Sequence, residues 1–287
     1  METVESPGGA GPGGTGDADP SGQAWNFDDR PRETPKAGAG PGRGPRRLPG
    51  THVARVALIF GLATPAVAVL GALGAHREVL SSFVGFRMFL ISLPLALVGF
   101  LFALFARIRA RGDRDPSARR KALVATLLGV VTIASVAGLA LPAVGFPIIN
   151  DITTDVDDPP LFVHALTLEA NAGRDMSYPE GFAEQQRSAY PTLATVRIAK
   201  ASVDTFVLAR ETLSALRDTR VVDEDRRTGR IEAVSISGVF RFKDDVVVRV
   251  RETEGGSMID MRSKYRDGRG DMGVNARRIE DFFALLH

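Results

Sequence analysis

Three long apolar stretches constrain this chain more than any other feature of its sequence. A helix of about 20 apolar residues spans the ~30 Å hydrocarbon core of a bilayer, and each stretch reaches about that length. Each also contains proline, at Pro65, Pro94 and Pro142 respectively, which packed helices in lipid tolerate better than soluble helices do. The sequence therefore predicts a three-helix transmembrane region within residues 51–149. Its apolar stretches are Val56–Ala75, Met88–Ala106 and Ala122–Ile149. The apolar segment Val79–Phe86 extends the second stretch upstream, with Arg87 between them.

The segments on either side of this region differ in composition. Residues 1–50 are rich in glycine and proline, and Trp25 and Phe27 are their only aromatic residues. Such a segment buries too little apolar surface to offset its ordering entropy, so we predict a disordered cytoplasmic tail. Residues 150–287 are long enough to form one hydrophobic core and are predicted to be a separate domain. The chain has no cysteine, which excludes disulfides, thiol nucleophiles and Cys-ligated zinc.

The distribution of lysine and arginine predicts the orientation of the three helices. The connection after the first stretch is short and holds His76, Arg77 and Glu78, whereas the connection after the second is strongly basic. Basic flanks stay in the cytoplasm, so three spans place residues 150–287 on the far side. We expect a multi-pass protein of the bacterial inner membrane with a periplasmic C-terminal domain. The basic residues of the second connection are Arg107, Arg109, Arg111, Arg114, Arg119, Arg120 and Lys121.

The charge balance also bounds the partners. The formal net charge is +2, but the basic residues gather at the membrane flanks and the last domain is mildly acidic. The basic character of the chain therefore reflects its membrane flanks, and no nucleic-acid surface is expected. The expected partner is the lipid bilayer, with an anionic ligand or an envelope protein as a further candidate.

Residues 150–287 have the patterns of an α+β domain, in which two main helices pack on one face of an antiparallel sheet. Apolar residues recur at helical spacing in Ser202–Leu216 and Val274–Leu286, and Asp271 or Gly273 can start the second helix. Asn150–Pro160 is expected to be a polar loop, and residues 161–190 are expected to be irregular. Strands are expected at 192–198, 220–223, 231–242, 246–252 and 258–265, with Lys243–Asp245 as a turn.

The last hairpin can be analysed residue by residue. If Gly255–Gly256 is its two-residue turn, Arg249 lies opposite Arg262, and like charges in that position are unfavourable. The pair then needs a neutralising partner, because an arginine fork matches carboxylates and phosphates. We favour an aspartate of the same chain over an anionic ligand or lipid headgroup. The even-numbered valines of 246–250 are expected to face inward with Met261, Ser263 and Tyr265, and Arg251, Asp260 and Lys264 to share the arginine face.

The opening loop crowds four aspartates into eight residues, Asp151, Asp155, Asp157 and Asp158. They do not fit the twelve-residue calcium loop, because Val156 stands where that loop needs glycine and Phe162 where it needs glutamate. We favour local side-chain-to-backbone bonds over a less regular calcium site. Of the four histidines, only His164 lies within the domain proper, which is too few for a zinc site or a Ser-His-Asp arrangement. No metal and no cofactor are expected.

The domain resembles the bacterial and plant family known as domain of unknown function 1499. The similarity lies in "NDITTDVDDPPLF" (150–162), in "IEA" followed by "FRFKDDVVVRV" (240–250), and in "IDMRSKYRDGRGDMGVNARRIEDFFALL" (259–286). The family has "SR-x-G" where this chain has "KYRDG" (264–268). Its members often carry a few membrane spans before the domain. The resemblance implies the fold and the placement, and it implies no reaction.

Three functions fit these patterns. The leading hypothesis is a non-catalytic binding or envelope-associated module that presents arginines to an anionic group or a protein. The alternative is an enzyme of unknown reaction that uses carboxylates beside those arginines, and the third is a structural spacer in which the charges only pair internally. The candidate ligand-binding or structural polar cluster comprises Asp151, Asp155, Arg249, Arg262, Ser263, Arg266, Asp271 and Asn275.

Overall fold

The computed structural model describes residues 9, 11, 13, 50–112, 115–141, 145–270 and 272–286. The predicted disordered tail therefore lies almost entirely outside the described residues. Pro142 and the candidate site residue Asp271 lie outside them as well.

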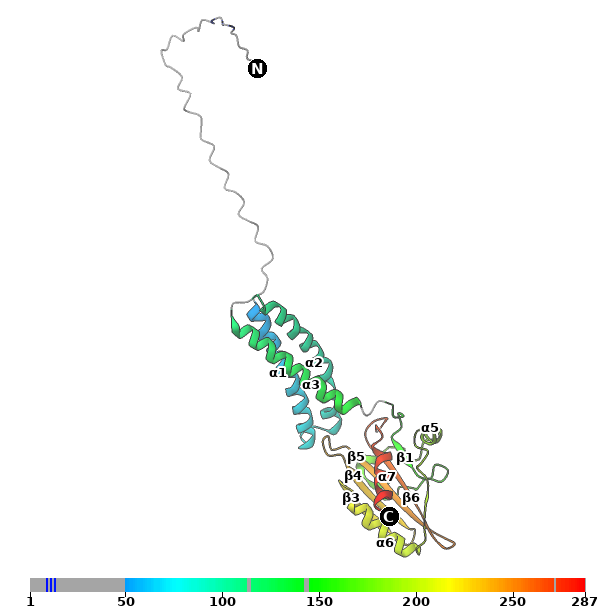
Figure 1. The fold of residues 1–287 in the computed structure, drawn as a ribbon. Coiled ribbons are helices and arrows are strands. Elements are labelled where there is room, and N and C mark those ends of the chain that lie inside the picture. The colour runs from blue at the N-terminus through cyan, green and yellow to red at the C-terminus, as the bar shows by residue number, and fades with distance from the viewer. Residues whose placement is uncertain are drawn as a thin grey trace. The chain divides into compact units, whose positions relative to one another are not determined.

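Three long helices precede the domain, as predicted: α1 (Gly50–His76), α2 (Ser82–Ala110) and α3 (Pro116–Ala140) (Figure 1). Each is long and apolar enough to cross a membrane. Their buried contacts are made largely by alanines, while large side chains such as Leu70 and Val131 are exposed. Small residues at the contacts and large apolar residues outside are typical of helices that pack together in lipid.

The third helix is shorter than its apolar stretch. α3 ends at Ala140, whereas the sequence predicted a span that reaches Ile149. Ile149 is fully buried in the core of the following domain, and Phe146 packs against the same core. The end of the apolar stretch therefore belongs to the domain, because a buried core segment and a membrane span have the same composition.

The domain is built on an antiparallel sheet, in the order β1-β6-β5-β4-β3, with β2 pairing β6 beside β1. This is the predicted α+β class. The strands are β1 (Asp151–Thr153), β2 (Val196–Ile198), β3 (Thr219–Asp225), β4 (Arg230–Ile236), β5 (Lys243–Thr253) and β6 (Gly256–Tyr265).

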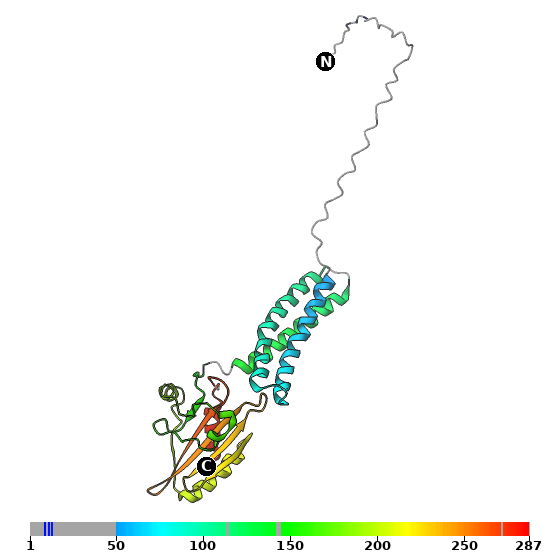
Figure 2. The same ribbon diagram turned by 180° about the vertical axis from the view of Figure 1, so that it is seen from behind.

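The two faces of the sheet carry different cover. Helices α6 (Ser202–Ala215) and α7 (Val274–Leu285) pack on the apolar face (Figure 1), where Phe206 and Leu213 of α6 and Ile279 and Phe282 of α7 are buried in the main core. The segment between β1 and β2 lies over the opposite face (Figure 2). It was expected to be irregular, but it contains α4 (His164–Thr167), η2 (Glu169–Asn171) and α5 (Phe182–Ala189).

Three predictions about the strands are wrong. Asn150–Pro160 was expected to be a polar loop, but Asp151–Thr153 forms β1, because it pairs with β6. In the β5–β6 hairpin Thr253 lies opposite Gly256, so the turn is Glu254–Gly255 rather than Gly255–Gly256. The register shift places Arg249 opposite Asp260, and not opposite Arg262. Because the shift is two residues, every side chain keeps its predicted face.

The third error concerns the β4–β5 connection. Lys243–Asp245 was predicted as a turn, but these residues begin β5, and β4 ends at Ile236. The chain turns instead through residues 237–242. Asp244 and Asp245 are both buried, because an arginine reaches each of them: Arg278 bonds Asp244, and Arg266 bonds Asp245.

The turn between β3 and β4 gives a first testable prediction. Gly229 has φ +69°, and a Cβ added to it would lie 2.0 Å from the carbonyl oxygen of Val250. Gly229→Ala is therefore expected to lower the free energy of unfolding by about 2–3 kcal/mol, from left-handed strain and backbone overlap together. Gly255→Ala is the matched control, since its φ is +77° but nothing lies within 4 Å of the added atom. It should cost only about 1 kcal/mol.

The measurement is a urea titration of the full chain in detergent, followed by pulse proteolysis. Equal midpoints for the two variants would contradict the close approach of Gly229 to Val250.

Candidate functional site

The sheet face opposite α6 and α7 carries a layer of charged side chains, which we name the charged face. The alternation of β4, β5 and β6 places them there, since every second residue of a strand faces the same side. The segment between β1 and β2 covers this layer, so its charges are removed from solvent. The buried members are Asp151, Glu232, Asp245, Asp260, Arg262 and Lys264.

Arg262 and Asp151 form the centre of the charged face. Arg262 Nε and Nη2 donate to the two Asp151 carboxylate oxygens at 2.9 and 2.7 Å, and both side chains are 0% exposed. Lys264 Nζ also donates to Asp151, at 2.8 Å. β1 supplies Asp151 because it pairs β6 with Asp151 opposite Lys264. The two-fold fork is the geometry in which arginine holds a carboxylate most firmly.

The remaining donors of Arg262 also have partners. Its Nη1 donates to the Pro160 carbonyl at 3.1 Å and its Nη2 to the Met176 carbonyl at 2.8 Å. The guanidinium carbon lies 4.8 Å from the centre of the Phe162 ring. Arg262 thus ties the covering segment to the sheet at three separate points, as a buried guanidinium must, because an unpaired one is very costly.

Tyr178 belongs to the same cover. Burial raises the pKa of its phenol well above the ordinary value, and the negative charge of Asp151 raises it further. The phenol therefore stays neutral and donates to Gln186 Oε1 at 3.1 Å. Gln186 in turn brackets Thr153, accepting from its backbone N–H and donating to its carbonyl. The side-chain amide of α5 thus extends the edge of the sheet beyond β1.

A second charged cluster lies toward the hairpin end of β5. Arg249 and Arg251 both contact the carboxylates of Asp155, Asp158 and Asp260, at 2.7–3.2 Å. Asp260 comes from β6, while Asp155 and Asp158 come from the opening loop. The loop therefore folds back over the two arginines and neutralises them. This cluster is more open than the first, since Arg251 is 34% exposed and Asp158 is 67% exposed.

Glu232 anchors the cover at a third place. Its Oε1 accepts the backbone N–H groups of Val163 and His164, both at 2.8 Å, and its Oε2 accepts that of Ala165 at 2.9 Å. These groups begin α4, which has no side-chain cap of its own. The Arg230 guanidinium lies 2.9 Å from Glu232 on the other side. A β4 carboxylate thus caps a helix of the covering segment.

The structure does not gather the predicted cluster into one site. Asp151 and Arg262 lie in the first cluster, and Asp155 and Arg249 lie in the second. Arg266 bonds Asp245 separately. Ser263 and Asn275 lie on the apolar face, where both bond Arg278.

Several residues of the charged face were not among the predicted site residues. Asp260 is fully buried, accepts from Thr154 and Thr195 and contacts both arginines of the second cluster. Its position opposite Arg249 follows from the correct hairpin register. Glu232 shows no local signal, because it alternates with Ile231 and Ala233 as a solvent-facing residue would. Only the position of the cover reveals that it is buried.

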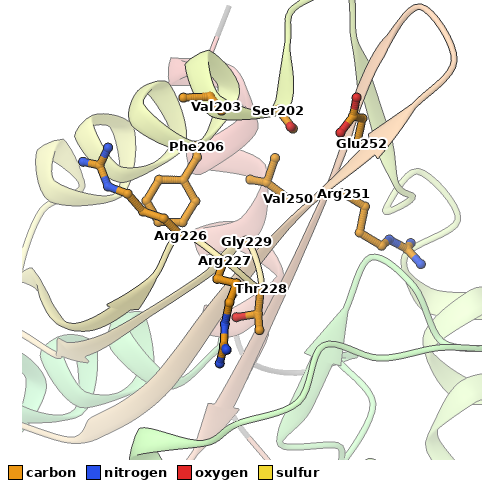
Figure 3. A pocket seen from close by; sticks show the side chains of 10 residues that line it. All are labelled: Ser202, Val203, Phe206, Arg226, Arg227, Thr228, Gly229, Val250, Arg251 and Glu252. Atoms are coloured by element: carbon orange, nitrogen blue, oxygen red, sulfur yellow. The ribbon is translucent and has the colours of Figure 1, made fainter.

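Figure 3 shows a pocket of about 410 Å³ at the start of α6, between Phe206 and the β3–β4 turn. The Arg226 guanidinium lies 5.6 Å from the centre of the Phe206 ring. The guanidinium groups of Arg226, Arg227 and Arg251 point in three different directions (Figure 3). Because these cations do not converge on one point, the pocket does not form a site for a single anion.

The described part of the chain contains no group of three or more His, Asp or Glu side chains that could hold a metal ion. The carboxylates of the charged face instead contact arginine, lysine, hydroxyl and backbone N–H groups, which are the partners that buried carboxylates need. As it stands, this layer joins the covering segment to the sheet.

One comparison with known proteins identifies a family for the sheet domain. Residues 151–286 match the model of a family described as a protein of unknown function, DUF1499. The match begins at β1 and runs to the end of α7, so it covers the sheet domain and none of the three membrane-length helices. No curated protein and no solved structure matches the chain. The resemblance predicted from the opening and closing motifs is confirmed.

Proposed function

We propose that this chain, whose residues 151–286 match the DUF1499 family, is a membrane-anchored binding module that acts outside the cytoplasm and has no catalytic role. The membrane anchoring rests on three helices that are long and apolar enough to cross a bilayer. The placement rests on the basic connection between the second and third helices, which the positive-inside rule assigns to the cytoplasm. In a Gram-negative bacterium the domain would lie in the periplasm.

The observation that favours a binding module over an enzyme is the pairing of Arg262 with Asp151. Both side chains are fully buried and bonded to each other by two hydrogen bonds. Asp155 Oδ2 also lies 3.2 Å from both Arg249 and Arg251, in the more open second cluster. These two carboxylates therefore serve to hold the cover on the sheet. Binding then falls to exposed side chains that do not take part in these pairs.

The placement is tested with reporters that are active on one side of the membrane only. Alkaline phosphatase fused after His287 is expected to be active, because it folds outside the cytoplasm. The same enzyme fused after Gly112, between α2 and α3, is expected to be inactive, and a fluorescent protein that folds in the cytoplasm should give the reverse result at both positions. Phosphatase activity at Gly112 with none after His287 would overturn the proposed placement.

A further inference from the structure

A basic pocket of about 510 Å³ lies at the end of the charged face that the covering segment leaves open, between β3, β4, the start of β5 and α4. Arg220, Lys243, Arg266 and His164 contribute its polar side chains, and Val234 and Ile236 are among its apolar residues. No carboxylate side chain is among the described residues that line it. The pocket therefore has a positive potential above an apolar floor.

Two of these cations form no ion pair with a carboxylate among the described residues. Arg220 and Lys243 are exposed, and within the described ranges neither forms an ion pair with an aspartate or glutamate. Arg266 differs, because Asp245 accepts two hydrogen bonds from its guanidinium. The arginines of the charged layer are all paired, so the free charge of this face is concentrated at Arg220 and Lys243. A guanidinium fork beside an ammonium group is an arrangement that recognises phosphate.

The pocket also lies beside the ends of the membrane-length helices. The β4–β5 connection, residues 237–242, contacts the chain at the end of α1. The Gly238 carbonyl is 3.0 Å from Nδ1 of His76, the last residue of α1, and Arg241 bonds Glu78, two residues further on, at 3.0 Å. The Phe240 ring packs on Phe86 of α2. Lys243 directly follows this connection, so the contacts hold it near the level at which α1 ends and α2 begins.

A second hollow continues the basic pocket toward the helices. It measures about 420 Å³, shares Lys243 and Arg266 with the first, and is lined by Val79, Leu80 and Phe83 from the α1–α2 connection and the start of α2. Two carboxylates also line it: Glu78, which bonds Arg241, and Asp267. Val79 is 80% exposed. Basic side chains thus meet exposed apolar ones at a helix end, which is where lipid headgroups meet acyl chains.

We propose that Arg220 and Lys243 bind the phosphate group of an anionic membrane lipid in this pocket. The phosphate contacts the two cations, and the acyl chains leave past Val79 and Phe83 into the bilayer. A soluble phosphate anion offers the same charge but has no apolar part to use that exit. This inference deepens the proposed function, because it assumes a binding module and names its ligand class.

The test uses the full chain in micelles, titrated with phosphatidylglycerol or with phosphatidylcholine, with bound lipid counted by native mass spectrometry. The wild type is expected to prefer phosphatidylglycerol. The double variant Arg220→Ala/Lys243→Ala should bind phosphatidylglycerol about tenfold more weakly, because two charge-assisted contacts are lost. Its affinity for phosphatidylcholine should change little. Both residues are exposed, so the fold should be retained.

The matched control is Arg197→Ala/Lys200→Ala, which also removes one arginine and one lysine. Both control residues are exposed, and β2, which holds Arg197, pairs β6 at the sheet edge opposite β3. An equal loss of lipid in both double variants, or a wild type without preference for phosphatidylglycerol, would overturn the proposal. If inorganic phosphate binds the wild type and displaces the lipid at equal concentration, the ligand is a soluble anion and the lipid proposal is wrong.

The outcome is independent of the reporter experiment, because lipid binding in micelles does not depend on orientation. An active reporter after His287 together with no lipid preference would leave the anchored placement standing and remove only this pocket. A lipid preference together with an inactive reporter after His287 would support the pocket and contradict the placement outside the cytoplasm.

Discussion

Replacing Arg262 by alanine is expected to lower the free energy of unfolding of the domain by about 3–5 kcal/mol. The guanidinium is fully buried and bonds Asp151 as well as the carbonyl oxygens of Pro160 and Met176. Its removal leaves these acceptors without their donor and leaves a cavity under the Phe162 ring. Asp151→Ala should cost at least as much, because it strands both Arg262 and Lys264 without their shared carboxylate.

This loss is measured by pulse proteolysis of the full chain during a urea titration in detergent. Arg197→Ala provides the control, since an exposed arginine should change stability by no more than about 0.5 kcal/mol. Arg262→Lys should fall between the two, because it keeps the charge and loses the fork. A loss below about 1 kcal/mol for Arg262→Ala would be too small for a buried charge pair. Arg262 would then again be a candidate for ligand binding.

The faces of the last hairpin could be predicted from sequence, while its register could not. Alternation in β5 and β6 assigns Val248 and Met261 to one face and Arg249 and Asp260 to the other, as the structure has them. The turn was placed one residue too late because two glycines stand together. Only Gly255 has the positive φ of the turn, +77°. Gly256 is already in β6, and a Cβ there would lie 2.2 Å from the carbonyl oxygen of Ile198 in β2. That requirement comes from a distant strand.

The kind of contact between the opening loop and the charged face, a pairing of aspartates with arginines, could be predicted from sequence. The sequence left open whether the aspartates of the opening loop neutralise Arg249 and Arg262, and it did not assign one aspartate to either arginine. In the structure Asp151 pairs with Arg262 and Asp155 with Arg249. The start of β5 was harder to anticipate, because "KDD" has the composition of a turn. Asp244 and Asp245 lie in a strand, where Arg278 of α7 and Arg266, the residue after β6, neutralise them. Such long-range charge pairs leave no local periodicity.

Glu232 gives the second large effect that we expect. Glu232→Ala removes the acceptors of the Val163, His164 and Ala165 N–H groups and leaves Arg230 without one of its carboxylates. Because Glu232 is only 1% exposed, water does not readily replace it, and the loss should exceed about 3 kcal/mol. Glu232→Gln keeps one oxygen acceptor and should cost less. Glu252→Ala, an exposed carboxylate of the neighbouring β5, should have little effect.

Hydrogen exchange of the full chain shows where in the domain the substitution has its effect and how large the effect is. Glu232→Ala should speed exchange in α4 and η2 far more than in β5 and β6, since it releases the cover while the sheet keeps its core on the other face. Unchanged protection at Val163–Ala165 would contradict the capping role.

The same variant connects the charged layer to the proposed lipid site. His164 and Leu168 form one wall of the basic pocket, and Glu232 holds that wall in place through the first turn of α4. Glu232→Ala should therefore weaken phosphatidylglycerol binding although Glu232 does not line the pocket. Glu232→Gln, which retains part of the cap, should restore a corresponding part of the binding. A Glu232→Ala protein that loses the protection of α4 and still binds the lipid at full strength would contradict this link. It would show that α4 is not needed for binding and that Arg220 and Lys243 are sufficient.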